Sequence, residues 1–365
     1  MFRALWWIVA AGVVIASCAA TDGFSLGEDD PVEPSAHVEV PVEETVDEPD
    51  DEPQEVEEPD EPADEADDAD DGPLSPLIGM PIDEDLLDSP VLQVKIENSP
   101  EARPQTGLDA ADVVYEELVE GGITRFFAVF HSQLPESAGP VRSARPVDVH
   151  LMGGYGRSGF VFSGAREEVQ SLMGATSAIP LSEGHRSLYR KPERNAPHNL
   201  YLDVEVASGA VAGRDPDQID EVGWVFDEDA PDGQIACDDE CETEPGEAID
   251  VAMSYAFTTG WEYDADEGGY RRSQNGAPFD AAGDGEIIAA NVVVLDTRHY
   301  ISESGYPDTD LITDDAAALV LRDGKRYEAR WKKPTIDAPI TVMDLDGEPL
   351  PFKPGPTWVL LPDSI

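Results

Sequence analysis

Charged residues of both signs gather in one stretch, GLDAADVVYEELVEGGITRFFAVFHSQLPESAGPVRSAR, between Gly107 and Arg145. Glu116 and Glu120 precede a Gly121-Gly122 pair, and Arg125 follows it. Two glycines are typical of a two-residue hairpin turn, because both central positions need positive φ. With that turn, Arg125 would lie diagonally between Glu116 and Glu120 on one sheet face, at about 7–8 Å between β-carbons. The set is either a hairpin salt bridge or a site that orients a polar ligand.

The loop after this hairpin places Arg142, Ser143 and Arg145 directly before a predicted helix that starts at Pro146. Proline suits the first turn of a helix, and free N–H groups at a helix start attract anions. Guanidinium groups beside them favour a pocket for carboxylate, phosphate or sulfate. The alternative is that these arginines form ion pairs with nearby carboxylates: Glu116, Glu120 and Asp148.

A third cluster, YRKPERNAPHNLY over residues 189–201, combines basic residues with His198 and Asn199 in a proline-broken loop. Such loops often carry binding residues. His198 could act as a general acid or base, or it could be a hydrogen-bonded structural residue. Signatures for zinc helices, phosphate loops and dinucleotide binding are missing, so we predict neither a metal site nor a cofactor.

The chain begins with Met1-Phe2-Arg3 and an apolar run over residues 4–16, which is typical of an export signal. The run ends in Ile15-Ala16-Ser17-Cys18, which resembles the lipobox of bacterial lipoproteins. We therefore expect a signal peptide over residues 1–17 and a diacylglyceryl thioether on Cys18. This modification would anchor the protein to the bilayer at the extracytoplasmic face of the bacterial cell membrane.

Residues 18–73 consist mostly of Asp, Glu, Pro, Ala and Val, which predicts an acidic disordered tether. The formal net charge of the chain is −55, with 78 Asp and Glu against 23 Lys and Arg. Such a charge repels phosphate backbones and argues against nucleic-acid binding. In an exported protein, the nearby Cys237 and Cys241 favour a local disulfide over a two-cysteine zinc site.

The rest of the chain predicts an α+β protein with two parts. Residues 74–210 mix strands and helices, with a strand at 91–96, a strand at 159–162 and helices at 146–151 and 167–173. Residues 220–365 lack a long helical period and predict a mostly β domain. Its expected strands are separated by turn residues such as Asp323-Gly324: 249–256, 258–263, 270–273, 287–295, 317–322, 325–331, 340–343 and 357–361.

Several motifs together resemble the YerB-like bacterial lipoprotein family: RPQTGLDAADVVYEELVEGGITRFFAVF, GPVRSARP, YRKPERNAPHNLY, YDADEGGYRRSQNGAPFD, NVVVLDTRHY and PGPTWVLL. This resemblance implies an N-terminal and a C-terminal domain of unknown function, from about residue 77 onwards. The residues that fall in its characteristic motifs are the candidate binding residues: Arg103, Gln105, Glu116, Glu120, Arg125, Arg142, Ser143, Arg145, His198 and Asn199. One departure is Ser163-Gly164-Ala165-Arg166, where a histidine-containing stretch is expected.

Two functions fit these residues. The first is a lipid-anchored envelope protein that binds an anionic or glycan-like ligand, or a protein partner, through the Arg and Glu cluster. The alternative is an envelope hydrolase or transferase that acts on wall glycan or peptide, with Glu116 or Glu120 as acid or base and His198 assisting. Paired carboxylates about 5–10 Å apart beside a groove would favour a glycosidase.

Lipid anchoring can be tested directly at Cys18. Replacing Cys18 with Ala removes the only thiol at the end of the apolar run, so we expect the protein to leave the membrane fraction. Fractionation of cells that express the wild-type or the variant chain measures this. Full retention of the variant in the membrane fraction would contradict the lipidation hypothesis.

Overall fold

The computed structural model describes residues 72–233, 245–283, 285–302 and 305–365. The predicted signal peptide, Cys18, the acidic segment up to residue 71 and the cysteine pair Cys237 and Cys241 lie outside the described residues. All of the described residues belong to one compact unit. Within the residues described, no helix is both long and apolar enough to cross a membrane.

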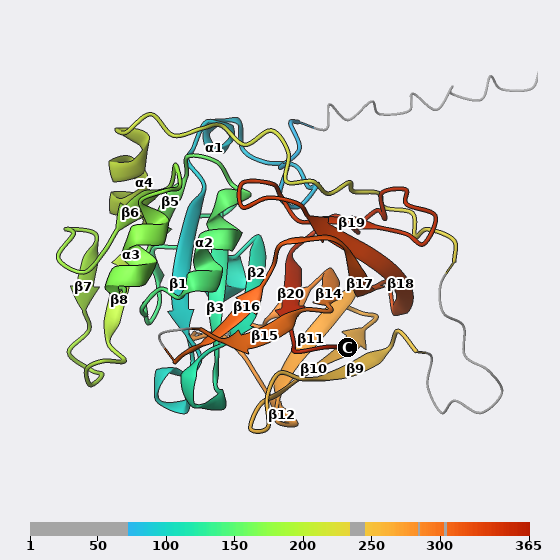
Figure 1. Ribbon diagram of the computed structural model, residues 1–365. Coiled ribbons are helices and arrows are strands. Elements are labelled where there is room, and N and C mark those ends of the chain that lie inside the picture. The colour runs from blue at the N-terminus through green and yellow to red at the C-terminus, as the bar shows by residue number, and fades with distance from the viewer. Residues whose placement is uncertain (1–71, 234–244, 284, 303–304) are drawn as a thin grey trace, which may run out of the picture. The chain divides into compact units, whose positions relative to one another are not determined.

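A ten-stranded mixed sheet forms the centre of this unit, in the order β19-β18-β17-β14-β20-β2-β3-β1-β5-β6. Both halves of the sequence contribute strands to it (Figure 1). Its strands are β1 (Leu92–Glu97), β2 (Val113–Leu118), β3 (Thr124–Phe130), β5 (Gly159–Val161), β6 (Ile179–Leu181), β14 (Asn291–Leu295), β17 (Thr313–Arg322), β18 (Lys325–Lys333), β19 (Thr341–Met343) and β20 (Thr357–Leu361).

Smaller sheets and short helices cover this central sheet. The helices are α1 (Glu84–Leu87), α2 (Pro146–Gly153), α3 (Glu167–Met173) and α4 (Val204–Ala212), with 3₁₀ turns η1 (Pro100–Ala102), η2 (Leu108–Ala110) and η3 (Glu120–Gly122). The smaller sheets are made of β4 (Ser137–Ala138), β7 (Leu188–Arg190) and β8 (Leu200–Asp203); of β9 (Ala248–Ala252), β10 (Thr258–Asp264), β11 (Gly269–Gln274), β12 (Ala277–Pro278) and β13 (Ile288–Ala289); and of β15 (Arg298–Ile301) and β16 (Pro307–Asp310).

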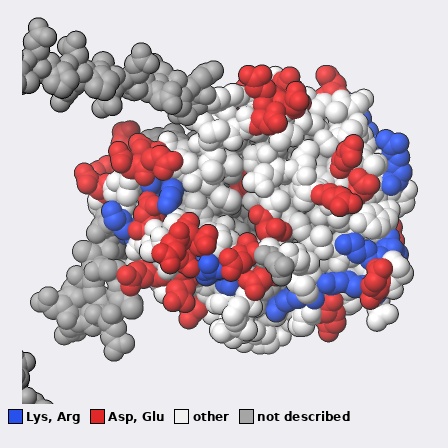
Figure 2. Space-filling view, turned by 180° about the vertical axis from the view of Figure 1, so that it is seen from behind, with Lys and Arg blue, Asp and Glu red and all other residues white. Residues whose placement is uncertain are grey.

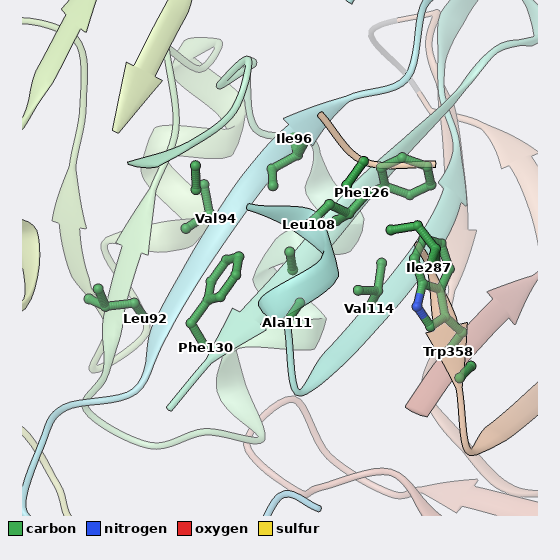
Figure 3. Close-up of a cluster of buried hydrophobic side chains, with 14 of the residues drawn as sticks. Leu92, Val94, Ile96, Leu108, Ala111, Val114, Phe126, Phe130, Ile287 and Trp358 are labelled. Atoms are coloured by element: carbon green, nitrogen blue, oxygen red, sulfur yellow. The ribbon is translucent and has the colours of Figure 1, made fainter. Parts of the chain in front are cut away.

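The central sheet is buried on both faces. Along β2, Val114 belongs to one apolar core and Val113 to the other, as expected for alternating side chains. The first core includes α4 and the β9–β13 sheet, and Figure 3 shows Val114, Phe126 and Trp358 in it. The second core includes α2, α3 and Leu311, which follows β16. Strands covered on both faces are continuously apolar, which explains the sequences NVVVL in β14 and TWVLL in β20.

The α+β class and the β-rich second half are confirmed. Helix α3 spans the predicted 167–173, β20 spans the predicted 357–361, and α2 starts at Pro146 as expected. Helix α4 is not among the predicted elements. The predicted division near residues 210–220 does not separate two sheets, because β20 pairs with both β14 and β2 in parallel.

The predicted register of the β2–β3 hairpin is wrong by one residue. Arg125 lies opposite Glu117, and Glu116 lies opposite Phe126. Gly121 and Gly122 have the expected positive φ values of 79° and 72°, but the backbone N–H of Val119 bonds to the Ile123 carbonyl at 2.9 Å, which leaves three residues in the loop. A one-residue slip exchanges the two faces. Glu116 and Arg125 therefore point to opposite sides of the sheet.

Trp358 on β20 joins the two halves in the first core. Its ring lies 5.2 Å from Phe126 and 5.1 Å from Trp261, measured between centroids. We expect Trp358→Ala to lower the free energy of unfolding by about 3–5 kcal/mol, because it leaves a cavity between the sheets. Urea unfolding should show one cooperative transition that shifts as a whole. Leu345→Ala, at a side chain 63% exposed, is the control; equal shifts for both variants would contradict this packing role.

Candidate functional site

A row of buried charges crosses three neighbouring strands on the face covered by α2 and α3. Arg125 on β3 lies opposite Glu97 on β1 and opposite Glu117 on β2. Lys95 of β1 binds Asp148 Oδ1 of α2 at 2.7 Å and contacts Glu117 Oε1. Burial lowers the pKa of Lys95 to about 8, although Asp148 opposes this shift. An arginine between two carboxylates is therefore present, but with Glu97 and Glu117 as its neighbours.

The loop over residues 139–145 lies across the end of this row. It pairs with β1, because Glu97 N donates to the Pro140 carbonyl at 2.9 Å and Arg142 N donates to the Lys95 carbonyl at 2.8 Å. Arg125 Nη1 donates to the Ser143 carbonyl at 2.8 Å. The sequence GPVRSARP thus folds as an extended segment whose backbone is fixed by β1 and by Arg125.

Each guanidinium nitrogen of Arg145 donates to a protein acceptor. Its Nε and Nη2 donate to Glu120 Oε2 at 2.9 and 2.7 Å, and its Nη1 donates to the Ala144 carbonyl at 2.9 Å. Asp148 accepts the Arg145 backbone N–H at 2.6 Å and so caps the start of α2. Burial alone would raise the pKa of Glu120, but hydrogen bonding and charge from Arg145 hold it below its usual value.

Arg142 and His198 share the Glu97 carboxylate. Arg142 Nε lies 3.0 Å from Glu97 Oε1, and His198 Nδ1 lies 3.0 Å from Glu97 Oε2. Ser99 Oγ also donates to Oε1, at 3.1 Å. The Glu97 side chain is 1% exposed, whereas those of Arg142 and His198 are each 22% exposed. This group of side chains therefore opens to solvent on its cationic side.

Donors remain free at this opening. Within the described part of the chain, the two terminal nitrogens of Arg142 have no hydrogen-bond acceptor, and neither has the buried Nε of Arg125. The pKa of Arg125 is lowered to about 10 by burial, and then by the positive charges of Arg145 and Arg142. The three guanidinium groups are thus close enough to repel one another, and an anion would relieve that repulsion.

The opening lies at the carboxyl ends of parallel strands, the edge where open α/β sheets commonly bind ligands. Strands β1, β5 and β6 run parallel. Glu97 ends β1, and Ser163, which follows β5, lies with its Oγ 3.3 Å from Ser143 Oγ. Beyond β6, Arg190 contacts Glu183 and donates to Asn199 Oδ1 at 2.6 Å. Asn199 Nδ2 also donates to the Lys191 and Arg194 carbonyls, so Asn199 stabilises the loop that carries His198.

Glu116 belongs to a separate network on the opposite face. It accepts from Thr124 Oγ1 at 2.7 Å, from Thr259 Oγ1 at 3.0 Å and from Arg272 Nη2 at 2.9 Å. Both Glu116 and Arg272 have side chains that are 0% exposed. The Arg272 guanidinium lies 3.9 Å from the Phe279 ring centroid. Burial lowers the pKa of Arg272, and Glu116 opposes this shift.

Arg103 and Gln105 join this second network through the end of β1. Arg103 Nε donates to Asn98 Oδ1 at 3.1 Å, and Gln105 Nε2 donates to the Glu97 carbonyl at 2.8 Å. Asn98 in turn donates to Thr124 Oγ1 at 2.8 Å. The predicted candidates therefore divide into two sets. The set that shares one opening is Glu120, Arg125, Arg142, Ser143, Arg145 and His198, with Asn199 at its edge, and the set behind the sheet is Arg103, Gln105 and Glu116.

Sequence reasoning missed the buried partners Lys95, Glu97 and Arg272. A signal for the first two exists, since Lys95 and Glu97 alternate with the apolar Val94 and Ile96 in a strand that is buried throughout. Charges in such a strand require counter-charges. Arg272 gives no comparable signal, because only the folded chain brings it beside Glu116, 156 residues earlier.

The paired carboxylates on which the hydrolase alternative depended do not form. Glu116 is enclosed with Arg272, while Glu120 binds Arg145 at the opening. No group of three or more His, Cys, Asp or Glu that could hold a metal occurs among the described residues. The geometry instead places partly exposed guanidinium groups beside a histidine at the strand ends.

The network behind the sheet predicts a stability effect. Glu116→Gln leaves the Arg272 charge buried without a counter-charge, so we expect the free energy of unfolding to fall by about 3–5 kcal/mol. Chemical denaturation measures the loss. Glu262→Gln, at an exposed position of β10, is the matched control and should change stability by less than about 0.5 kcal/mol. Equal stability of the two variants would show that the Glu116–Arg272 pair is unimportant.

Comparisons with known proteins agree with this architecture. Residues 77–217 match the N-terminal domain, and residues 249–359 the C-terminal domain, of a protein of unknown function (DUF3048). A Bacillus subtilis (strain 168) protein named "Putative lipoprotein YerB" is 30% identical over 302 residues, which cover 79% of this chain and 86% of that protein. The crystal structure of Bacillus subtilis YerB matches with a TM-score of 0.67 and 27% identity, covering 80% of this chain and 97% of that one. The chain therefore belongs to the YerB-like family with paired DUF3048 domains, as the motifs predicted.

Proposed function

We propose that this protein is a lipid-anchored binding protein of the bacterial cell envelope whose opening beside Arg142 recognises an anionic group. This proposal depends on the two terminal nitrogens of Arg142, which have no hydrogen-bond acceptor among the described residues. Guanidinium groups bind carboxylate and phosphate strongly, because their hydrogen bonds are assisted by charge. Arg125 lies opposite Glu97 in the sheet, and His198 Nδ1 contacts the same carboxylate, so Glu97 is shared among several donors.

The balance of charge around the opening supports anion binding. Four cationic side chains and four carboxylates meet here: Lys95, Arg125, Arg142 and Arg145, with Glu97, Glu117, Glu120 and Asp148. The whole chain, by contrast, has 78 acidic against 23 Lys and Arg residues. Seen from behind, acidic groups gather in clusters over the surface (Figure 2). A neutral site with free donors on its open side is favourable for an anion that such a surface otherwise repels.

Anchoring through Cys18 is supported by the lipobox-like sequence and by the relative's name, which contains the word lipoprotein. The anionic groups of the envelope within reach would then be carboxylates and phosphates of wall polymers or lipids. Arg145 has a positioning role in this proposal, because Glu120 and the Ala144 carbonyl already occupy its donors. Arg142 and Arg125 are the contact residues.

Inorganic phosphate is the probe for this function. We expect Arg142→Gln to weaken phosphate binding by about tenfold or more, because two charged donors are lost. Isothermal titration calorimetry on the exported chain measures the affinity. Arg330→Gln is the matched control, since Arg330 pairs with Asp315 elsewhere on the surface. Undetectable binding to the wild-type protein, or an equal affinity for the Arg142→Gln variant, would reject the proposal.

A further inference from the structure

A half-open cavity of about 660 Å³ lies beside the opening, between α3 and the edge strand β6. Its accessible apolar lining includes Ala165, Met173 and Ala178, which lie over the buried side chains of Met152, Phe160 and Phe162. Phe160 and Phe162 stack with centroids 5.1 Å apart, and Phe160 continues the stack to Phe127 at 5.6 Å. The volume falls in the range of about 300–1,000 Å³ that is usual for small-molecule sites. Methionine side chains adapt to flexible apolar ligands.

The wall of this cavity is bonded directly to the loop that carries the arginines. Ser163 N donates to the Arg142 carbonyl at 2.9 Å, and Ala144 N donates to the Gly164 carbonyl at 2.9 Å. Both Ser163 and Gly164 line the cavity. The loop segment that carries Arg142 is thus paired directly with the segment that lines the cavity.

The two features together select an amphiphile with an anionic head. We propose that the cavity takes the hydrocarbon chain of a long-chain alkyl phosphate while Arg142 and Arg125 bind its phosphate. This inference rests on the proposed function and names its ligand class. A phosphate monoester has about −1.5 to −2 charges at neutral pH and three acceptor oxygens, which suits several guanidinium donors better than one carboxylate does. Burial of the chain in the cavity would supply the affinity that an exposed anion site lacks.

Polar and apolar residues share the rim of the cavity. Glu183 is the carboxylate of the rim, and it is paired with Arg190. Gln170 Nε2 donates to the Ala165 carbonyl at 2.7 Å and holds the loop after β5 to α3. Ala178 and Pro180 lie on the cavity side of the edge strand, because the side chain of Ile179 between them packs into the first core. A larger side chain at residue 178 would therefore project into the cavity.

The experiment measures binding of ethyl, butyl, hexyl and octyl phosphate to the full exported chain, below their aggregation concentrations. We expect the affinity to rise by up to about fourfold for each methylene that enters the cavity. Ala178→Leu should abolish this rise and leave the affinity for inorganic phosphate unchanged. Ala175→Leu is the matched control, because Ala175 is exposed and does not line the cavity. Arg142→Gln should weaken binding of every phosphate in the series.

Failure of this inference differs from failure of the proposed function. Equal affinity across the series, with intact inorganic phosphate binding, overturns the chain site and leaves the anion site. A rise with chain length that Ala178→Leu does not reduce also overturns the chain site. Octyl glucoside bound as tightly as octyl phosphate would overturn the role of the charged head. Absence of binding by any phosphate, inorganic phosphate included, overturns both proposals.

Discussion

The position of β20 in the central sheet is the constraint on which the rest of the structure depends. This last strand lies parallel between β14 and β2, so its two edges bond to strands from different halves of the sequence. Its N–H and carbonyl groups form hydrogen bonds with both neighbouring strands, whose edges would otherwise be unpaired. The β2–β3 hairpin is thus held by the final residues of the chain, although it is close to the N-terminal end of the unit. The site at the hairpin is therefore held in place by strand pairing between residues that are far apart in the sequence.

Local elements could be predicted from the sequence because their signals are local. Pro146 begins α2, and Asp323 and Gly324 have the positive φ values of a tight turn between β17 and β18. The hairpin register could not be predicted, because β2 is buried on both faces and apolar alternation gives no preference there. The pairing of β20 with β2 could not be predicted either. A continuous apolar strand indicates burial but does not identify its neighbours.

For the candidate site, too, the residues of one loop could be predicted from the sequence, whereas their partners from distant segments could not. Arg142, Ser143 and Arg145 belong to one short loop, and the sequence places them together whatever the fold. Their actual partners depend on strand order, since Glu97 meets Arg142 only because the loop pairs with β1. The predicted cluster is wrong for Glu116, because one residue of register decides its face. Its partner Arg272 comes from a sheet that the sequence places in another domain.

The two charged networks on either side of the hairpin differ in one physical respect. The Glu116–Arg272 pair is enclosed, so the attraction between its two charges has to offset the cost of removing both from water. No donor of this pair is accessible to a ligand. In the Arg142–Glu97–His198 group, the Arg142 and His198 side chains stay partly in contact with water. The free-energy cost of removing this group from water is therefore smaller. Repulsion from Arg142 and Arg145 contributes to the lowered pKa of Arg125, after burial. An anion at the opening would offset that repulsion. Because Arg125 Nη1 also donates to the Ser143 carbonyl, the proposed anion site and the loop over residues 139–145 share one guanidinium group.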